Sequence, residues 1–293
     1  MVIERVHLGG PVWSCPRWVG TLFPEGARAP SFLSHYSRVF NAVEGNSTFY
    51  AVPPASTFAK WRDATPEGFK FCLKVPRTIT HDRMLVGADE PWAQFLHASA
   101  ELGDRLGPTM IQLPPTLGPP RLDALLRCLD VLPRDRGFAV EPRHPAFFGG
   151  TAAERALDAA LREREVDRVI FDATVLHAAG EDDPIVKVAQ GRKPRLPVPE
   201  IATANHPIIR LVGVGTPGAF DAVLERWAER VATWIAEGRS PHVFVHTADD
   251  IDVPALCGTF HAMLSRRTDV GVLGAWDDAV ARHGAGQISL FDP

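Results

Sequence analysis

The sequence predicts an α/β fold consisting of one (β/α)8 barrel of the TIM type. Short apolar, β-branched runs recur along the chain, and helical patterns lie between them. The length of 293 residues, with 45% hydrophobic side chains, is enough for one large barrel with a sizeable core. Several runs are almost continuously apolar, as parallel strands covered on both faces are. The predicted strands are Val2–Leu8, Val39–Glu44, Phe69–Val75, Thr109–Leu113, Phe138–Glu141, Arg168–Phe171, Ile208–Val212 and Val243–His246.

Helical patterns fill the intervals between these runs. Apolar residues at helical spacing extend from Leu122 to Leu129 and from Phe220 to Ile235. The tract Ala152–Glu165 is rich in Ala, Leu, Arg and Glu, which are good helix formers. An open doubly wound sheet is the structural alternative. It is disfavoured because Gly9-Gly10-Pro11, after the first strand, does not match the G-x-G-x-x-G phosphate turn.

Two connections are too long to be simple turns. One runs from Pro76 to about Pro91 and the other from Ala173 to Pro207. Both follow strands, so we expect both on the C-terminal face, where barrel enzymes carry their substrate loops. The second is rich in proline and basic residues around Gly191–Pro197. It could be a lid, a basic contact strip or an ordinary surface excursion.

Composition restricts the class of partner and compartment. The net charge of -4 provides no global attraction to nucleic acid or to an anionic membrane. The cysteines Cys15, Cys72, Cys128 and Cys257 form no C-x-x-C pair, which argues against a zinc ribbon and fits a reducing compartment. The opening residues lack a signal-peptide pattern, and no run reaches the length of a membrane span. We therefore expect a cytoplasmic protein without a membrane partner.

Polar side chains recur where the predicted strands end. Because the strand ends of a barrel converge on one mouth, these residues predict a polar site there. Carboxylates and imidazoles together can act as acid and base or as ligands of a divalent metal, so a metal cofactor stays open. The candidate catalytic residues are Glu44, His81, Glu141, His144, Asp172 and His246. The candidate substrate-binding residues are Asn46, Lys74, Gln112, Arg143 and Arg210.

Several of these candidates also have a structural interpretation. Glu44 and Lys74 could pair to close the top of the barrel. His144 could cap a loop, and His246 could be a satisfied core histidine. Asp172 could cap the turn that follows its strand.

Residues 40–50, with the sequence FNAVEGNSTFY, resemble the most distinctive segment of the DUF72 family, also called YecE-like proteins. The resemblance covers about residues 5 to 265. Further matches in the same order are Trp61 with Thr65-Pro66, Phe69–Lys74, Thr80-His81, Gln112–Pro115 and Val140–His144. The resemblance implies a TIM-type barrel and a site location but no established activity. Its matched site positions are Glu44, Lys74, His81, Glu141, Arg143 and His144.

The sequence departs from the pattern of this family in three places. Gly45 stands where isoleucine is usual, Val212 precedes Gly213 where many members carry histidine, and His246-Thr247 replaces paired asparagines. These departures put in doubt any mechanism that needs the missing groups. His246 could partly substitute for them as a donor or ligand.

The predicted domain organisation is a barrel over residues 1–270 and a tail over residues 271–293. In the tail, Gln287-Ile288-Ser289-Leu290-Phe291 resembles the pentapeptide that binds the bacterial sliding clamp. The resemblance implies that Gln287 occupies a polar subsite while Leu290 and Phe291 fill an apolar pocket. The alternative is that Leu290 and Phe291 dock on the barrel itself.

Three functions compete, and whether the protein is an enzyme stays open. The first is a hydrolase of phosphate esters or nucleic acid, linked to DNA replication or repair, with Lys74 and Arg143 binding phosphate and Glu44 or Glu141 as base or metal ligand. The second is a non-catalytic adaptor tethered to the clamp that binds nucleic acid or protein. The third is a sugar isomerase or glycoside-type hydrolase that uses Glu44 and Glu141.

Overall fold

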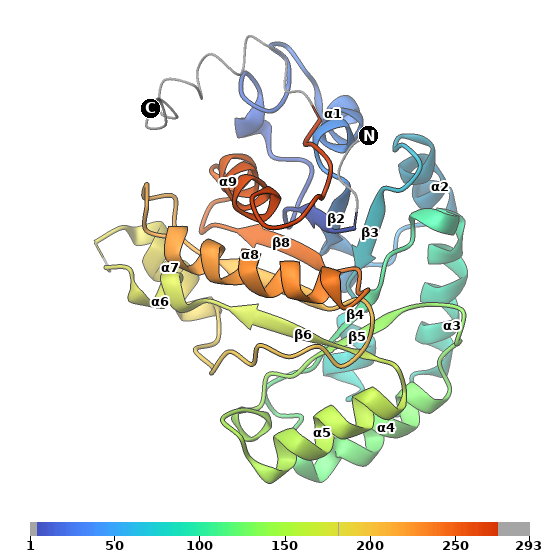
Figure 1. Cartoon of the computed structure of the whole chain (residues 1–293). Helices are drawn as coiled ribbons and strands as arrows, with labels where there is room; N and C mark the ends of the chain where they lie inside the picture. Colours follow the sequence, from blue (N-terminus) through green and yellow to red (C-terminus); the bar gives the residue numbers. More distant parts are fainter. Residues whose placement is uncertain (1–4, 181, 275–293) are drawn as a thin grey trace.

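Parallel strands line the interior of the molecule, and helices cover them on the outside (Figure 1). The computed structural model describes residues 5–180 and 182–274. The strands are β1 (His7–Gly9), β2 (Ala42–Gly45), β3 (Lys70–Leu73), β4 (Thr109–Gln112), β5 (Phe138–Glu141), β6 (Asp167–Asp172), β7 (Ile208–Val212) and β8 (His242–His246). Each overlaps one of the predicted strands. The predicted single α/β domain of alternating parallel strands and helices is therefore confirmed.

The helices follow the strands in turn. They are α1 (Ala29–Val39), α2 (Ala55–Asp63), α3 (Asp89–Ser99), α4 (Leu122–Asp130), α5 (Ala152–Glu163), α6 (Thr174–Ala178), α7 (Pro184–Arg192), α8 (Asp221–Ala236) and α9 (Val253–Ser265). Figure 1 shows α6 and α7, which belong to the long connection after β6, beyond the end to which β6 points. No helix in the described part of the chain is long and apolar enough to cross a membrane.

The strands pair as a six-stranded sheet, β1-β8-β7-β6-β5-β4, and a two-stranded sheet, β2-β3. Backbone contacts join the two sheets on both sides. Next to β3, Lys74 bridges in parallel to Met110, and Val75 N donates to Met110 O at 2.9 Å. Next to β2, Glu44 N donates to Gly10 O at 3.0 Å. The strands thus follow one another around the barrel.

Side chains complete the seam between β1 and β2. The Asn41 amide accepts from Leu8 N and donates to Val6 O, both at 2.8 Å. The Tyr36 hydroxyl donates to Ala42 O at 2.9 Å and accepts from Gly10 N at 2.7 Å. These bonds satisfy backbone groups that a regular ladder would otherwise pair. Gly9 permits the close approach, because a Cβ at this position would lie 1.9 Å from Ala42 O.

Every second residue of each strand faces the interior of the barrel, and the equivalent residues of the different strands form layers. The middle layer is apolar and consists of Ala42, Cys72, Met110, Ala139, Val169, Ile208 and Phe244. Two residues further along each of these strands, or directly after it, the same inward face carries Glu44, Lys74, Gln112, Glu141, Phe171, Arg210 and His246. The apolar layer therefore forms the floor beneath a polar layer at the carboxyl ends of the strands.

The end of the described chain returns to the barrel. Val270 is buried, and Gly274 N donates to Val39 O at 3.4 Å. The proposed clamp-binding residues Gln287, Leu290 and Phe291 lie outside the described residues.

Candidate functional site

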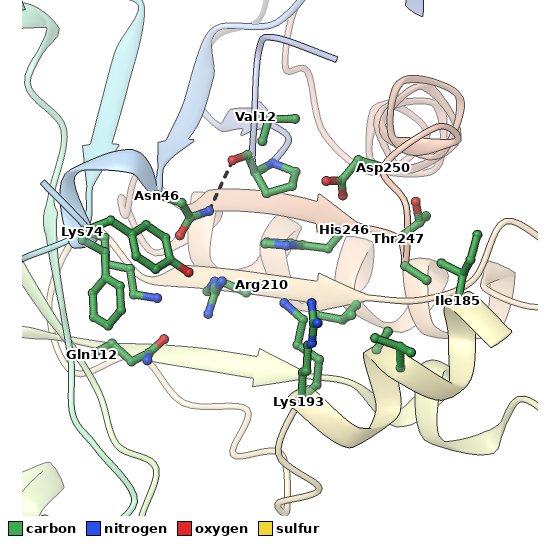
Figure 2. A pocket seen from close by; sticks show the side chains of 18 of the residues that line it. Val12, Asn46, Lys74, Gln112, Ile185, Lys193, Arg210, His246, Thr247 and Asp250 are labelled. Atoms are coloured by element: carbon green, nitrogen blue, oxygen red, sulfur yellow. Dashed lines mark hydrogen bonds between the residues drawn. The ribbon is translucent and has the colours of Figure 1, made fainter. Parts of the chain in front are cut away.

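A cavity of about 830 Å³ opens above the polar layer (Figure 2). Figure 2 shows Lys74, Gln112, Arg210 and His246 directed into the same space from different strands, with Ile185 of α7 on its other side. Asn46 also lines the cavity, and its amide donates to Pro11 O at 3.2 Å. The predicted convergence of strand-end residues thus places Asn46, Lys74, Gln112, Arg143, Arg210 and His246 around one cavity.

Arg210 links the carboxylates of the polar layer. Its guanidinium donates from Nε and Nη2 to the two oxygens of Glu44, at 2.8 and 2.7 Å, and from Nη1 to Glu141 Oε2 at 2.7 Å. Arg143 donates to the other oxygen of Glu141 and, at 3.1 Å, to Gln112 Oε1. The Phe171 ring lies 5.1 Å from the Arg210 guanidinium and 4.4 Å from that of Arg143. Each charge in this network therefore has a partner.

The network keeps both carboxylates ionised. Burial alone would raise the pKa of Glu44, but Arg210 and His246 lower it well below its ordinary value. Burial likewise opposes ionisation of Glu141, yet Arg143, Arg210 and Lys74 lower its pKa to about 2. Because both groups are ionised at neutral pH and already accept from guanidinium groups, neither is available as a proton donor.

His246 is a neutral imidazole held by Glu44. Its Nε2 lies 3.0 Å from Glu44 Oε2, and burial lowers the pKa of His246 to about 4 although Glu44 opposes the shift. Because the Glu44 carboxylate only accepts, we assign the proton of the neutral ring to Nε2. Nδ1 is then the basic atom of the ring, and His246 lines the cavity.

Two lysines facing the cavity have no anionic partner. Lys74 Nζ lies 4.3 Å from the centroid of the Phe49 ring, and Lys193 Nζ lies 5.9 Å from that of Phe171. Neither ammonium group makes a hydrogen bond or ion pair within the part of the chain that the structure describes. Burial, with a contribution from Arg210, lowers the pKa of Lys74 to about 8 and lowers that of Lys193 as well. Cations in a cavity that form no ion pair favour an anionic ligand.

Asp250, in the loop after β8, is the remaining carboxyl group of the cavity wall. Its backbone has a φ of 61°, a conformation that is uncommon outside glycine and often found at functional sites. Burial raises the pKa of Asp250 to about 6.

Of the six predicted catalytic residues, His246 lines the cavity and the other five do not. Glu44 and Glu141 lie beneath it in the polar layer, whereas His81, His144 and Asp172 belong neither to the cavity lining nor to that layer. His81 bonds through Nδ1 to Thr80 Oγ1 at 2.8 Å, and its ring makes a T-shaped contact with the Phe49 ring, with 5.1 Å between the ring centroids. His144 Nδ1 accepts from Ala146 N at 3.1 Å, and so caps the short helix that follows.

Asp172 also faces away from the cavity, because Phe171 beside it on β6 occupies the inward position. Its carboxylate accepts from Thr174 N at 3.0 Å and from Trp227 Nε1 at 2.8 Å, which ties β6 to α8. The capping interactions foreseen as alternatives for His144 and Asp172 are thus present.

Five residues that line the cavity were not predicted as site residues from the sequence. They are Arg192, Lys193, Phe49, Tyr50 and Asp250. Arg192 and Lys193 belong to the basic segment at the end of the long connection, so the charge of that segment was the available signal. No sequence pattern distinguished Asp250 from other loop carboxylates.

Metal ligands are not gathered at this cavity. Among residues 5–180 and 182–274, no group of three or more His, Cys, Asp or Glu side chains is placed to hold a metal ion. Glu44 and Glu141, the carboxylates beneath the cavity, contact arginines instead.

The fold and the site define a barrel protein with a polar, cation-rich cavity at the carboxyl ends of its parallel strands. Comparison with known families agrees with this class. The family model described as "Protein of unknown function DUF72" matches residues 7–277, and the chain belongs to this family.

Relatives support the assignment. The chain is 37% identical over 254 residues to the UPF0759 protein YecE of Escherichia coli strain K12, covering 87% of this chain and 90% of the relative. It is 26% identical over 182 residues to the UPF0759 protein YunF of Bacillus subtilis strain 168, covering 57% of this chain and 64% of that protein.

Solved structures support the fold. A DUF72 family protein of Enterococcus faecalis V583 matches with a TM-score of 0.67 at 19% identity, over 90% of this chain and 98% of that one. Another from Thermotoga maritima MSB8 matches with a TM-score of 0.61 at 21% identity, over 89% of this chain and 99% of that one.

Proposed function

We propose that the cavity is the active site of an enzyme that hydrolyses small phosphate esters. The observation that carries this proposal is the pair of unpartnered lysines, Lys74 and Lys193, above carboxylates that arginines already hold. A neutral ligand would leave both ammonium groups without an ion-pair partner. An anion would pair with them directly.

The charge balance of the cavity fits a phosphate monoester. Its cationic side chains are Lys74, Arg143, Arg192, Lys193 and Arg210. Against these five stand three carboxylates, namely Asp250 in the wall and Glu44 and Glu141 bonded to Arg210, which leaves a surplus of two positive charges. A phosphate monoester carries about two negative charges at neutral pH.

Two side chains with separated pKa values supply the proton transfers. Lys74, with a pKa of about 8, is protonated at pH 7, whereas His246, with a pKa of about 4, is not. In the proposed reaction, water attacks phosphorus, gives a proton to His246 Nδ1, and the bond from phosphorus to the ester oxygen breaks. The leaving oxygen takes a proton from the Lys74 ammonium group. Arg143, Arg210 and Lys193 hold the phosphoryl oxygens.

Hydrolysis of aryl and alkyl phosphates tests this mechanism. We expect wild-type protein to release phosphate from both, and Lys74→Met to lower kcat/KM at least about 100-fold for an alkyl ester, the lower end of the usual range for a lost general acid. The loss should be much smaller for p-nitrophenyl phosphate, whose leaving group needs no proton. Lys60→Met, which removes an exposed lysine of α2, is the matched control. Absence of phosphate release by the wild type from a panel of mono- and diesters would exclude the proposal.

The alternative substrate of the proposed hydrolase is a phosphodiester of nucleic acid. The C-terminal pentapeptide favours this alternative. In this alternative, Gln287, Leu290 and Phe291 bind the sliding clamp. Such binding requires the cytoplasmic location that the sequence predicts. Purified clamp should bind the full chain and not a chain lacking residues 287–293. Equal binding by both would remove the role of the tail and leave the small-ester proposal untouched.

The two-carboxylate alternative has less support. A glycoside-type hydrolase needs one carboxyl group that donates a proton. Glu44 and Glu141 both accept from Arg210, and the pKa of each lies below its ordinary value.

A further inference from the structure

Exposed apolar side chains gather around the cavity. Tyr50 is 76% exposed, Ile185 49% and Val188 52%, and all three line the cavity. They are three of the seven large apolar side chains that are exposed in the described part of the chain. Scattered exposed apolar residues need no explanation, but a concentration of them at one cavity marks a binding surface.

Helix α7 brings the apolar and cationic features together. Ile185, Val188, Ala189 and Arg192 follow the i, i+3, i+4, i+7 spacing of one helix face, and all four line the cavity. This stripe is apolar in the first turns of α7 and cationic at its end, where Lys193 follows. Figure 2 shows Ile185 on the side of the cavity away from Lys74.

Side-chain hydrogen bonds cap the start of α7 and join the helix to the region of α6. At its start, the Asp183 carboxylate accepts from Ile185 N at 2.7 Å. Further along, Gln190 Nε2 donates to Leu176 O at 2.8 Å and to Ala179 O at 3.0 Å, both in the region of α6. The helix that carries the apolar stripe is thus capped and joined to the region of α6, and Ile185, Val188 and Ala189 form part of the cavity wall.

The cavity is also much larger than a phosphate group. Its volume of about 830 Å³ lies within the range of sites for whole organic ligands, about 300 to 1,000 Å³. A ligand bound through phosphate at Lys74 and Lys193 leaves most of this space to its organic part.

We propose that the ester bound here carries a hydrocarbon group, alkyl or aryl, whose phosphate lies against Lys74 and Lys193 and whose hydrocarbon lies against Ile185 and Val188 of α7. This inference rests on the proposed phosphate-ester site and specifies its substrate class. A sugar phosphate fits less well, because its hydroxyl groups would lose water against apolar side chains without gaining partners there.

Binding of alkylphosphonates tests this inference, because their carbon–phosphorus bond resists ester hydrolysis. Calorimetric titration would compare inorganic phosphate, methyl-, butyl- and hexylphosphonate, and ribose 5-phosphate. We expect the affinity to rise about two- to fourfold for each added methylene group, from the free energy of burying one methylene. Ribose 5-phosphate should bind no more tightly than methylphosphonate.

Substitution of the apolar stripe should remove the chain-length dependence. In the double variant Ile185→Ser with Val188→Ser, methyl- and hexylphosphonate should differ less than threefold, while inorganic phosphate binds as in the wild type. Val131→Ser is the matched control, because Val131 is 78% exposed and does not line the cavity. It should keep the full dependence.

The outcomes separate the two proposals. Binding of inorganic phosphate without any effect of chain length, or tighter binding of ribose 5-phosphate than of butylphosphonate, would overturn the hydrocarbon specificity alone. If neither phosphate nor any phosphonate binds, the phosphate-ester site itself fails. Retained chain-length dependence in the double variant would show that other residues bind the hydrocarbon, and would overturn the assignment to α7.

Discussion

Both carboxylate oxygens of Glu44 accept hydrogen bonds from Arg210, at 2.8 and 2.7 Å, although 166 residues separate the two in the chain. This contact joins β2 to β7 across the top of the barrel and fixes the ionised state of Glu44. Arg210 also reaches Glu141 on β5, so one guanidinium connects three strands.

Breaking this ion pair should destabilise the barrel strongly. Glu44→Gln places an amide donor against the guanidinium, and we expect the free energy of unfolding to fall by about 3–5 kcal/mol, as for other broken buried pairs. The exposed pair of Arg62 and Glu101, at 3.7 Å, provides the comparison. Glu101→Gln should cost less than about 1 kcal/mol. Equal losses in urea unfolding of the two variants would show that the buried pair is not a structural link.

Anion affinity should fall as the pH rises through about 8. The pKa of Lys74 is about 8 in the folded protein, so its charge is present below that pH and is lost above it. A bound anion stabilises the charged form and moves this transition upward. Phosphate titrations between pH 6.5 and 9.5 would measure the dependence. Lys74→Met should weaken binding about tenfold or more at pH 7 and flatten the profile, whereas Lys60→Met should reproduce the wild type. A pH profile unaffected by Lys74→Met would contradict this role.

Stability should fall as the pH drops from about 6.5 to 4. Burial holds the pKa of His7 and of His246 at about 4, below the unfolded value of 6.5, and lowers that of His242 as well. The stability that these neutral histidines contribute is complete above pH 6.5 and is lost as they take up protons. Urea midpoints measured at pH 7, 5.5 and 4 should therefore decrease.

Asp167 has the opposite effect on stability over the same pH range. Burial raises its pKa from 3.8 to about 7, so ionisation of Asp167 costs stability at neutral pH and this cost disappears on acidification. Asp167→Asn should raise stability at pH 7 by up to about 4 kcal/mol, the equivalent of a shift of about three units. It should also make the decrease toward pH 4 steeper. A variant less stable than the wild type at pH 7, or with an unchanged slope, would disprove this account.

The seam between β1 and β2 should depend on Asn41. Asn41→Ala removes the partners of Leu8 N and Val6 O, and each buried group left unsatisfied costs about 1–3 kcal/mol. Asn205→Ala, at an exposed position, is the control and should change stability by less than about 0.5 kcal/mol. Unfolding free energies from urea titration would compare the two. An Asn41 variant as stable as the control would mean that the ladder closes without this side chain.

The fold could be predicted from the sequence because strand and helix periods are local properties. Apolar runs identified the position of every strand. Polar residues at the ends of these runs indicated where the mouth of the barrel lies. The seam was not foreseen, because Asn41 and Tyr36 replace ladder bonds only after the barrel closes.

The site was predicted in part for the same reason. Strand-end position identified Lys74, Glu141 and His246, but the contacts of these side chains depend on register between distant strands. Position alone also selected His144, whose side chain bonds within its own loop, and Asp172, whose side chain bonds to the turn after β6 and to Trp227 of α8. Alternation along β6 would have indicated that Asp172 points outward once Val169 was recognised as part of the inner layer.

Calorimetric titration of the wild-type protein with inorganic phosphate at pH 7, repeated with Lys74→Met and Lys193→Met combined, tests the central claim most directly. The unpartnered lysines predict one binding site per chain whose affinity falls at least about 100-fold in the double variant, at about tenfold for each lost charge. Binding that is absent in the wild type, or unchanged when both lysines are removed, would contradict the assignment of the cavity as a phosphate site.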